Sequence, residues 1–260
     1  MSNNQLAILI PLCSKNQDWK TLSDIDLIDK MLDHLMLSLS KKHPYKLYLG
    51  YDENDEFFVK NHDLLVKRFP KVNVTIFPRE CNGNPTKAWN LLLDKAFKDK
   101  DNRWFYQCGS DIVHIVKNWD DYFVNLMKKH DDDIICGGCD MAFWCERVVR
   151  DQAGILENVF FGRPLYERLG FLFPPEVKTW FSDDIITKIY RNVDRCYICP
   201  NIKYHNANRV GGSNEKSRYI PPENQPIAKN WSEIANKYTK EAFPEYELTL
   251  EQLNKLPKYN

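Results

Sequence analysis

Two groups of acidic residues stand where the sequence changes from apolar to polar. Asp111 follows the apolar run WFYQC, and Asp183 with Asp184 opens a helix-like segment behind two aromatic residues. A carboxylate at a strand end can ligate Mg²⁺ or Mn²⁺, because these ions prefer oxygen ligands, and a carboxylate can also act as a general base. The structural alternatives are a turn-capping role for Asp111 and a helix N-cap at Ser182 or Asp183. A cap accounts for only one member of the acid pair.

Four cysteines form two Cys-x-x-Cys pairs, Cys136 with Cys139 and Cys196 with Cys199. Four thiolates at this spacing could hold zinc in a tetrahedral site. Zinc-binding pairs usually occupy tight turns, whereas both pairs here lie in apolar, strand-like runs, so we expect buried thiols instead.

The hydrophobic pattern predicts the elements that must position these residues. Apolar runs predict strands at residues 6–12, 45–52, 71–77, 103–108, 132–138 and 195–200. Helical spacing predicts helices at residues 22–40, 56–68, 84–99 and 118–129, the first beginning at Ser23 or Asp24 and the third at Pro85. Residues 160–192 predict a short strand, a helix-like segment, a turn and a helix that begins at the acid pair.

The alternation of strands and helices predicts an α/β fold with a mainly parallel sheet flanked by helices. Ligands of such sheets bind beyond the carboxyl ends of the strands, where the acids at the ends of strands should gather. Lys and Arg total 36 and Asp and Glu total 36, so there is no basic field for nucleic acid or an anionic membrane. The sequence shows neither a signal peptide nor an apolar run of about 18 residues, so we expect a cytoplasmic protein with no membrane span and reduced thiols.

Six stretches carry a resemblance to a known family when they are taken in order. They are ILIPLCSK, YLGYDENDEFF, NGNPTKAWN, WFYQCGSDI, NVFFGRPLYERLGFLFPPEVKTWFSDDIITKIY and YHNANRVGGSNEKSRYIP. Together they resemble the GT-A glycosyltransferases that use nucleotide-sugar donors, and most of all a branch found in algae and large DNA viruses. The resemblance implies a GT-A (Rossmann-like) domain over residues 1–220, followed by a polar helical extension over residues 221–260.

The resemblance also implies roles for individual residues. Those expected to contact the nucleoside diphosphate are Pro11, Ser14, Asp52, Asp55, Asn84, Thr86, Lys87, Asn90 and Ser110. Asp111 would hold the Mn²⁺ or Mg²⁺ that bridges both phosphates. His205 resembles a histidine that some members place after the last strand near the metal or diphosphate, and the structural alternative is an ordinary surface histidine. One acid of the pair would take the proton of the attacking hydroxyl, which implies inversion at the anomeric carbon. We favour Asp184 over Asp183 as this base, because Asp183 is the more plausible helix cap.

The expected activity is therefore metal-assisted transfer of a sugar from a nucleoside-diphosphate sugar to a hydroxyl of a glycan acceptor. Ser110 departs from the family, which often has an acid there, and a serine adds no charge for the metal. This departure keeps open a non-catalytic nucleotide or glycan binder of the same fold. A sugar nucleotidyltransferase is a further alternative, although PLCSKNQDW lacks the glycine-rich, basic loop of that class. The C-terminal extension could cover the acceptor side, join a second copy of the chain in a homodimer, or only pack on the surface.

Overall fold

The structure of the protein is a computed structural model that describes residues 4–69, 71–81, 84–141, 154–178, 181–206 and 227–245. Its strands are β1 (Gln5–Pro11), β2 (Tyr45–Asp52), β3 (Val72–Phe77), β4 (Asn102–Gln107), β5 (Ile112–His114), β6 (Ile135–Asp140), β7 (Phe160–Gly162) and β8 (Cys196–Asn206). Its helices are α1 (Asp26–Ser38), α2 (Glu56–Lys60), α3 (His62–Arg68), α4 (Pro85–Lys98), α5 (Trp119–Lys129), α7 (Arg163–Leu169), α8 (Ser182–Arg191) and α9 (Ile227–Ala242), with short 3-10 helices η1 (Leu22–Asp24) and η2 (Arg79–Cys81).

The strands form one mixed sheet in the order β3-β2-β1-β4-β7-β6-β8-β5. Strands β3, β2, β1 and β4 are parallel, as are β6 and β8. β7 runs antiparallel to both β4 and β6, and β5 runs antiparallel to β8. The expected α/β sheet with flanking helices is confirmed. Because β7 is reversed, the residues that precede it lie at the same edge of the sheet as the residues that follow β4.

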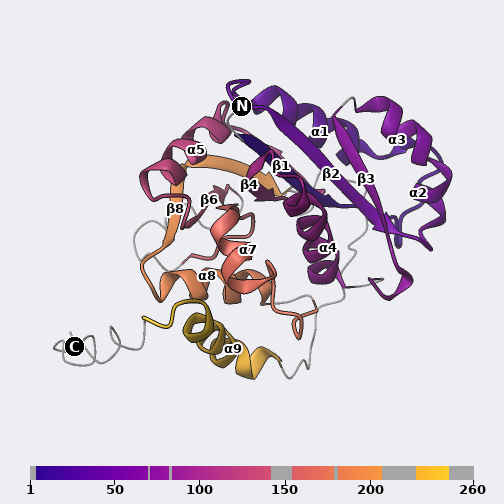
Figure 1. Cartoon of the computed structure of the whole chain (residues 1–260). Coiled ribbons are helices and arrows are strands. Elements are labelled where there is room, and N and C mark those ends of the chain that lie inside the picture. Colours follow the sequence, from indigo (N-terminus) through magenta and orange to yellow (C-terminus); the bar gives the residue numbers. More distant parts are fainter. Residues whose placement is uncertain are drawn as a thin grey trace.

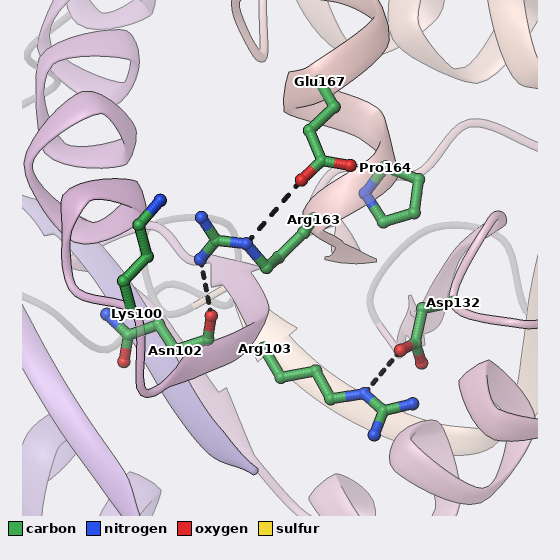
Figure 2. Close-up of a pocket in the computed structure, with 7 residues that line it drawn as sticks. All are labelled: Lys100, Asn102, Arg103, Asp132, Arg163, Pro164 and Glu167. Carbon is green, nitrogen blue, oxygen red and sulfur yellow. Dashed lines mark hydrogen bonds and ion pairs between the residues drawn. The ribbon is translucent and has the colours of Figure 1, made fainter. Parts of the chain in front are cut away.

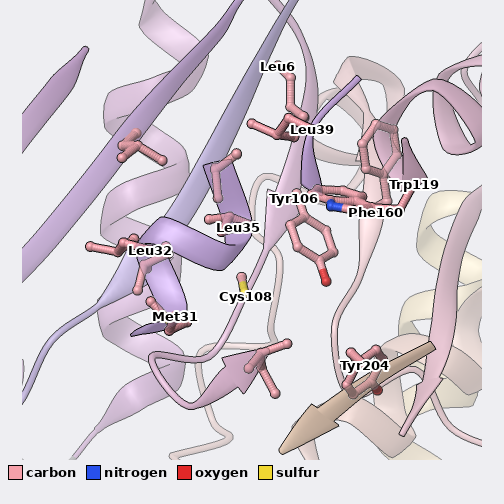
Figure 3. Packing of buried hydrophobic residues seen from close by; sticks show 14 of the residues in the cluster. Leu6, Met31, Leu32, Leu35, Leu39, Tyr106, Cys108, Trp119, Phe160 and Tyr204 are labelled. Carbon is pink, nitrogen blue, oxygen red and sulfur yellow. The ribbon is translucent and has the colours of Figure 1, made fainter. Parts of the chain in front are cut away.

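The two faces of the sheet pack into separate hydrophobic cores, because side chains alternate along each strand. On β1, Ile8 faces the core covered by α1, α3 and α5, and Leu9 faces the core covered by α4, α7 and α8. Figure 1 shows these helices on opposite sides of the sheet. In the first core, the ring of Tyr106 on β4 lies 4.6 Å from that of Trp119 on α5, beside Phe160 of β7 (Figure 3).

Two of the expected helices differ in the structure. The helix expected over residues 56–68 is broken into α2 and α3 at Asn61, whose side-chain amide donates to the Phe57 carbonyl at 2.8 Å. Such a bond competes with the helical backbone. The helix expected to begin at Ser23 or Asp24 begins as α1 at Asp26, because the residues before it form the 3-10 turn η1.

The sequence prediction also ended one strand too early and missed another. Pro200 lacks an N–H group and is typical of a strand end, but β8 continues to Asn206 after a register shift against β6 between Gly137 and Cys139. The short strand β5, which was not expected, pairs with this continuation.

Helix α9 packs on α8 and closes the second core. Ala235 and Phe243 are fully buried there, and the Phe243 ring lies 5.4 Å from that of Tyr190 on α8. The expected extension over residues 221–260 is described only in part, since residues 221–226 and 246–260 lie outside the described residues. In the described part of the chain, no helix has both the length and the apolar character needed to cross a bilayer.

Candidate active site

The loop after β4 brings the carboxylate of Asp111 over the backbone of Gly109. A Cβ atom added to Gly109 would lie 2.4 Å from Asp111 Oδ1, far closer than two such atoms approach. A glycine is therefore needed for this approach of the carboxylate. Ser110, between them, is buried. The sequence-predicted metal ligand thus has a defined position at the carboxyl end of the sheet.

Pairing of β5 with β8 brings His205 close in the sheet to the turn that carries Asp111. Val113 lies opposite His205 in the antiparallel register. Asp111 is the turn residue directly before β5, two positions before Val113. His205 lies within β8, whereas the family resemblance implied a position after the last strand, and its Nδ1 is buried without a hydrogen-bond partner among the described residues.

These residues fit a divalent ion that takes few protein ligands. In the described ranges, no group of three or more His, Cys, Asp or Glu side chains could hold a metal by itself. Mg²⁺ and Mn²⁺ in nucleotide sites commonly take one or two protein ligands, with the remaining positions filled by phosphates and water. One carboxylate from Asp111 and one unpartnered imidazole nitrogen from His205 match this requirement.

Asp55 is bound within the protein and holds the loop after β1. Its Oδ2 accepts the Ser14 N–H at 2.8 Å and its Oδ1 accepts the Ser14 hydroxyl at 2.6 Å. Oδ1 also accepts the Phe58 N–H at 3.2 Å, so Asp55 caps α2 as well. Pro11 ends β1 just before this loop. Asp55 and Ser14 therefore shape the edge of the site by binding each other.

Asp52, at the end of β2, is in the opposite situation. Its Oδ1 is buried and has no hydrogen-bond partner among the described residues. Burial, together with the nearby charge of Asp55, raises the pKa of Asp52 to about 6. A buried carboxylate oxygen without a donor costs free energy, and a ligand that donates a hydrogen bond would remove that cost.

The start of α4 is built by its own polar residues. Asn84 caps the helix, because its Oδ1 accepts the Lys87 N–H at 3.1 Å. The Thr86 hydroxyl is buried and contacts the Val177 carbonyl. Lys87 lies on the first turn and is partly exposed, so among these residues its side chain is the one placed to reach a ligand.

Asn90 ties α4 to the turn that leads toward the acid pair. Its Oδ1 accepts the N–H groups of Leu172 and Phe173, both at 3.0 Å, and its Nδ2 donates to the Phe173 carbonyl at 2.7 Å. With three such bonds, Asn90 holds this turn in place. The donor contact that the family resemblance implies for Asn90 stays a prediction.

The acid pair lies in the first turn of α8 and carries raised pKa values. The N-cap of this helix is Phe181, in the left-handed conformation with φ 67°, so the expected cap at Ser182 or Asp183 is wrong. Asp183 Oδ1 accepts the Asp184 N–H at 3.1 Å. Burial raises the pKa of both carboxyls, and the charges of Asp184 and Glu157 raise that of Asp183 further. Asp184 is the less deeply buried of the two.

Two residues at this edge escaped the sequence prediction, Glu157 and Asn158. Glu157 acts on the pKa of Asp183, and Asn158 Oδ1 accepts the Gly109 N–H at 3.2 Å. Both precede β7. In a parallel sheet, only residues that follow strands reach the ligand edge. Because we expected parallel strands, we did not consider residues that precede a strand. The sequence contains no signal for the reversed direction of β7.

The described cysteines are free thiols. Burial raises the pKa values of Cys136, Cys196 and Cys199, which keeps these thiols protonated. This agrees with the expectation of buried thiols, and the described residues give no support to a zinc site.

A pocket of about 430 Å³ lies at the other, amino-terminal end of β4 (Figure 2). Its volume suits a small molecule, but its two guanidinium groups are already bonded. Arg103 Nε donates to Asp132 at 2.6 Å, and Arg163 donates to the carbonyls of Asn102 at 2.8 Å and Phe97 at 3.0 Å. The candidate active site is therefore the carboxyl-terminal edge of the sheet and not this pocket.

Comparison with known proteins supports the assignment of the fold. No protein-family model matches the sequence, and no curated protein matches it. The mannosyltransferase PcManGT from Pyrobaculum calidifontis, solved with GDP-Man and Mn²⁺, is similar with a TM-score of 0.59 at 13% identity, over 98% of this chain and 76% of that one. GalNAc-T7, solved with UDP, GalNAc and Mn²⁺, gives 0.58 at 14% identity, over 94% and 50% of the two chains.

Staphylococcus aureus TarS 1-349 in complex with UDP gives a TM-score of 0.52 at 14% identity and covers 77% of this chain. The present chain spans only 59% of that fragment. At such low identities the likeness concerns the fold alone, and the chain has the mixed α/β fold of the GT-A glycosyltransferases.

Proposed function

We propose that the protein transfers a sugar from a nucleoside-diphosphate sugar to a hydroxyl group of a glycan acceptor, with the help of a divalent ion and with inversion. The observation that carries the proposal is that carboxylates with raised pKa values lie at the carboxyl-terminal edge of the sheet, Asp52 at the end of β2 and the acid pair at the start of α8. Perturbed carboxyls at the edge where such sheets bind ligands favour a functional role over a structural one.

Asp52 and the start of α4 would receive the nucleotide. The unpartnered Oδ1 of Asp52 would accept a hydrogen bond from the nucleobase or ribose, and Lys87, with the amide groups of the first turn of α4, would meet the phosphates. Pro11 and Ser14 would line the base, in a loop that Asp55 keeps in shape.

Asp111 and His205 would hold Mn²⁺ or Mg²⁺, and Ser110 would bind a ribose hydroxyl or a metal-bound water. The ion supplies charge neutralisation of the leaving nucleoside diphosphate. The structural neighbours PcManGT and GalNAc-T7 were solved with Mn²⁺, which supports this kind of cofactor.

Asp184 would be the general base, as the less buried carboxylate of the pair. The raised pKa of Asp183 favours its protonated form, in which it adds no second charge beside the base. Asp184 can then accept the proton of the acceptor hydroxyl as that oxygen attacks the anomeric carbon. The resemblance to the branch found in algae and large DNA viruses stays a prediction.

The test is a thermal-shift panel of nucleoside diphosphates and nucleotide sugars, with and without Mn²⁺, on the wild type and on Asp111→Ala. A ligand at about a hundred times its Kd should stabilise the protein by about 2.7 kcal/mol. We expect one nucleotide sugar to stabilise the wild type only with Mn²⁺, and Asp111→Ala to lose the effect. A shift that ignores both Mn²⁺ and Asp111, or no shift at all, would refute the proposal.

A second candidate function, a non-catalytic binder, is favoured by Ser110, which leaves this loop with a single carboxylate. It predicts the same stabilisation without turnover. Release of nucleoside diphosphate from the stabilising donor, measured over hours at saturating Mn²⁺, separates the two functions.

A further inference from the structure

Asn158 lies two residues before the reversed strand β7, at the edge where β4 ends. Only 2% of its surface is exposed. Its Oδ1 accepts the Gly109 N–H at 3.2 Å. The backbone of Asn158 is also fixed, since a Cβ atom on Gly137 of β6 would lie 2.5 Å from the Asn158 carbonyl oxygen. Asn158 is therefore a rigid point from which the loop after β4 is held.

The position of the Gly109 peptide determines where Asp111 can place its carboxylate. Asp111 Oδ1 lies against the Gly109 Cα, so closely that a Cβ atom there would be 2.4 Å away. A rotation of the Gly109 peptide would move this contact and the carboxylate with it. The bond from Asn158 opposes that rotation, because it fixes the direction of the Gly109 N–H.

We propose that Asn158 is a positioning residue that fixes the Gly109 peptide and, through it, the Asp111 carboxylate. The inference deepens the function proposed above and rests on it where metal binding is concerned. The side-chain amide of Asn158 is suited to this role, because it presents an acceptor without adding a charge beside the acids of the site. Its side chain also interacts with the Tyr204 hydroxyl, where a hydrogen bond from Asn158 opposes the rise that burial causes in the pKa of that phenol.

Gln107 provides a matched control. It is equally buried, at 2% exposure, and its Oε1 accepts the Val159 N–H at 3.0 Å. Both side chains bond a backbone N–H across the junction of β4 and β7, but only Asn158 bonds the loop that carries Asp111. Loss of either side chain should destabilise the fold similarly, whereas only the loss of Asn158 should release the loop.

The first measurement is calorimetric titration of Mn²⁺ into protein saturated with UDP or with GDP. For Asn158→Ala we expect the apparent Kd for Mn²⁺ to rise about tenfold. This is the size of effect seen when a residue that orients a metal ligand is lost. For Gln107→Ala we expect a change below about twofold. Equal Kd values for the two variants would overturn the proposal. A wild type that takes up no Mn²⁺ with either nucleotide would instead overturn the proposed function.

The second measurement does not depend on metal or nucleotide. Amide hydrogen exchange by NMR should show the Gly109 N–H protected in the wild type and in Gln107→Ala, and unprotected in Asn158→Ala. Asn158→Asp keeps an acceptor oxygen at this position and should restore the protection. If Gly109 stays protected in a folded Asn158→Ala protein, Asn158 does not hold the loop, and the proposal is wrong whatever the outcome of the titrations.

Discussion

Replacement of Asp52 by Asn should stabilise the protein at neutral pH. The Asp52 carboxylate is partly buried, its Oδ1 has no hydrogen-bond partner among the described residues, and its pKa is raised to about 6 from 3.8. The folded protein therefore binds this proton more tightly than the unfolded chain does. Stability from this group is fully present below the unfolded pKa and is lost as the pH rises toward 6. An asparagine has no charge and avoids the loss.

The magnitude follows from the two pKa values. A rise from 3.8 to about 6 corresponds to about 3 kcal/mol, at about 1.4 kcal/mol for each pKa unit. Solvent reaches part of the carboxyl group and screens its charge, which reduces the expected gain for Asp52→Asn to about 1 to 2 kcal/mol at pH 7.5. The gain should be about half as large at pH 5 and nearly absent at pH 4.

Guanidinium denaturation at these pH values measures the gain, and Asp55→Asn is the control. Asp55 accepts bonds from the N–H and hydroxyl of Ser14 and from the N–H of Phe58, so its replacement should cost about 2 kcal/mol at pH 7.5. Two acids three positions apart should thus respond with opposite signs. If Asp52→Asn is no more stable than the wild type at pH 7.5, or gains equally at pH 5, the unpartnered carboxylate is not what limits stability there.

The remaining predictions concern the metal loop, the acid pair and the thiols. Gly109→Ala places a Cβ atom against Asp111 Oδ1 and should displace this flexible carboxylate. The variant should keep its stability to within about 1 kcal/mol but bind nucleotide about tenfold more weakly with Mn²⁺ in calorimetry; unchanged affinity would show that the position of the Asp111 carboxylate over Gly109 does not matter for binding. Asp184→Asn should lower kcat about 10² to 10⁴-fold in a product-release assay, while Asp183→Asn keeps most of the activity, and equal losses would argue against Asp184 as the base. The buried thiols of the two Cys-x-x-Cys pairs, Cys136, Cys139 and Cys199, should react with a thiol reagent only after unfolding, because burial raises the pKa of Cys136 and Cys199 among them; zinc released together with the thiols would refute this.

Local sequence patterns predicted correctly those elements whose bounds depend on neighbouring residues. The run YKLYLGYD predicts β2, whose bounds, Tyr45–Asp52, agree with the prediction. Pro85 marks the first residue of α4, as expected for a residue without an N–H to satisfy. The positions of Asp52 and Asp111 at the ligand edge follow from the same patterns, because Asp52 ends β2 and Asp111 lies in the loop after β4, and both strands belong to the parallel part of the sheet.

Contacts between distant segments decided what the sequence left open. Whether β7 runs parallel or antiparallel depends on its pairing with β4 and β6 and not on its own three residues, FFG. The roles of Glu157 and Asn158 follow from that direction. Phe181 replaces Ser182 as the cap of α8 by adopting φ 67°, an unusual conformation for a large side chain that no sequence pattern predicts.

The described acids with shifted pKa values are of two kinds, and the difference between them supports the choice of site. Hydrogen bonds from Lys42 and His43 lower the pKa of Asp121, and Lys46 lowers that of Asp99 in spite of its partial burial. These acids have partners and stabilise the fold. Asp52 and the acid pair have raised pKa values, so at neutral pH they cost stability. Such groups do not stabilise the fold, so their position at the carboxyl-terminal edge of the sheet supports our proposal that a cationic or hydrogen-bonding ligand binds there.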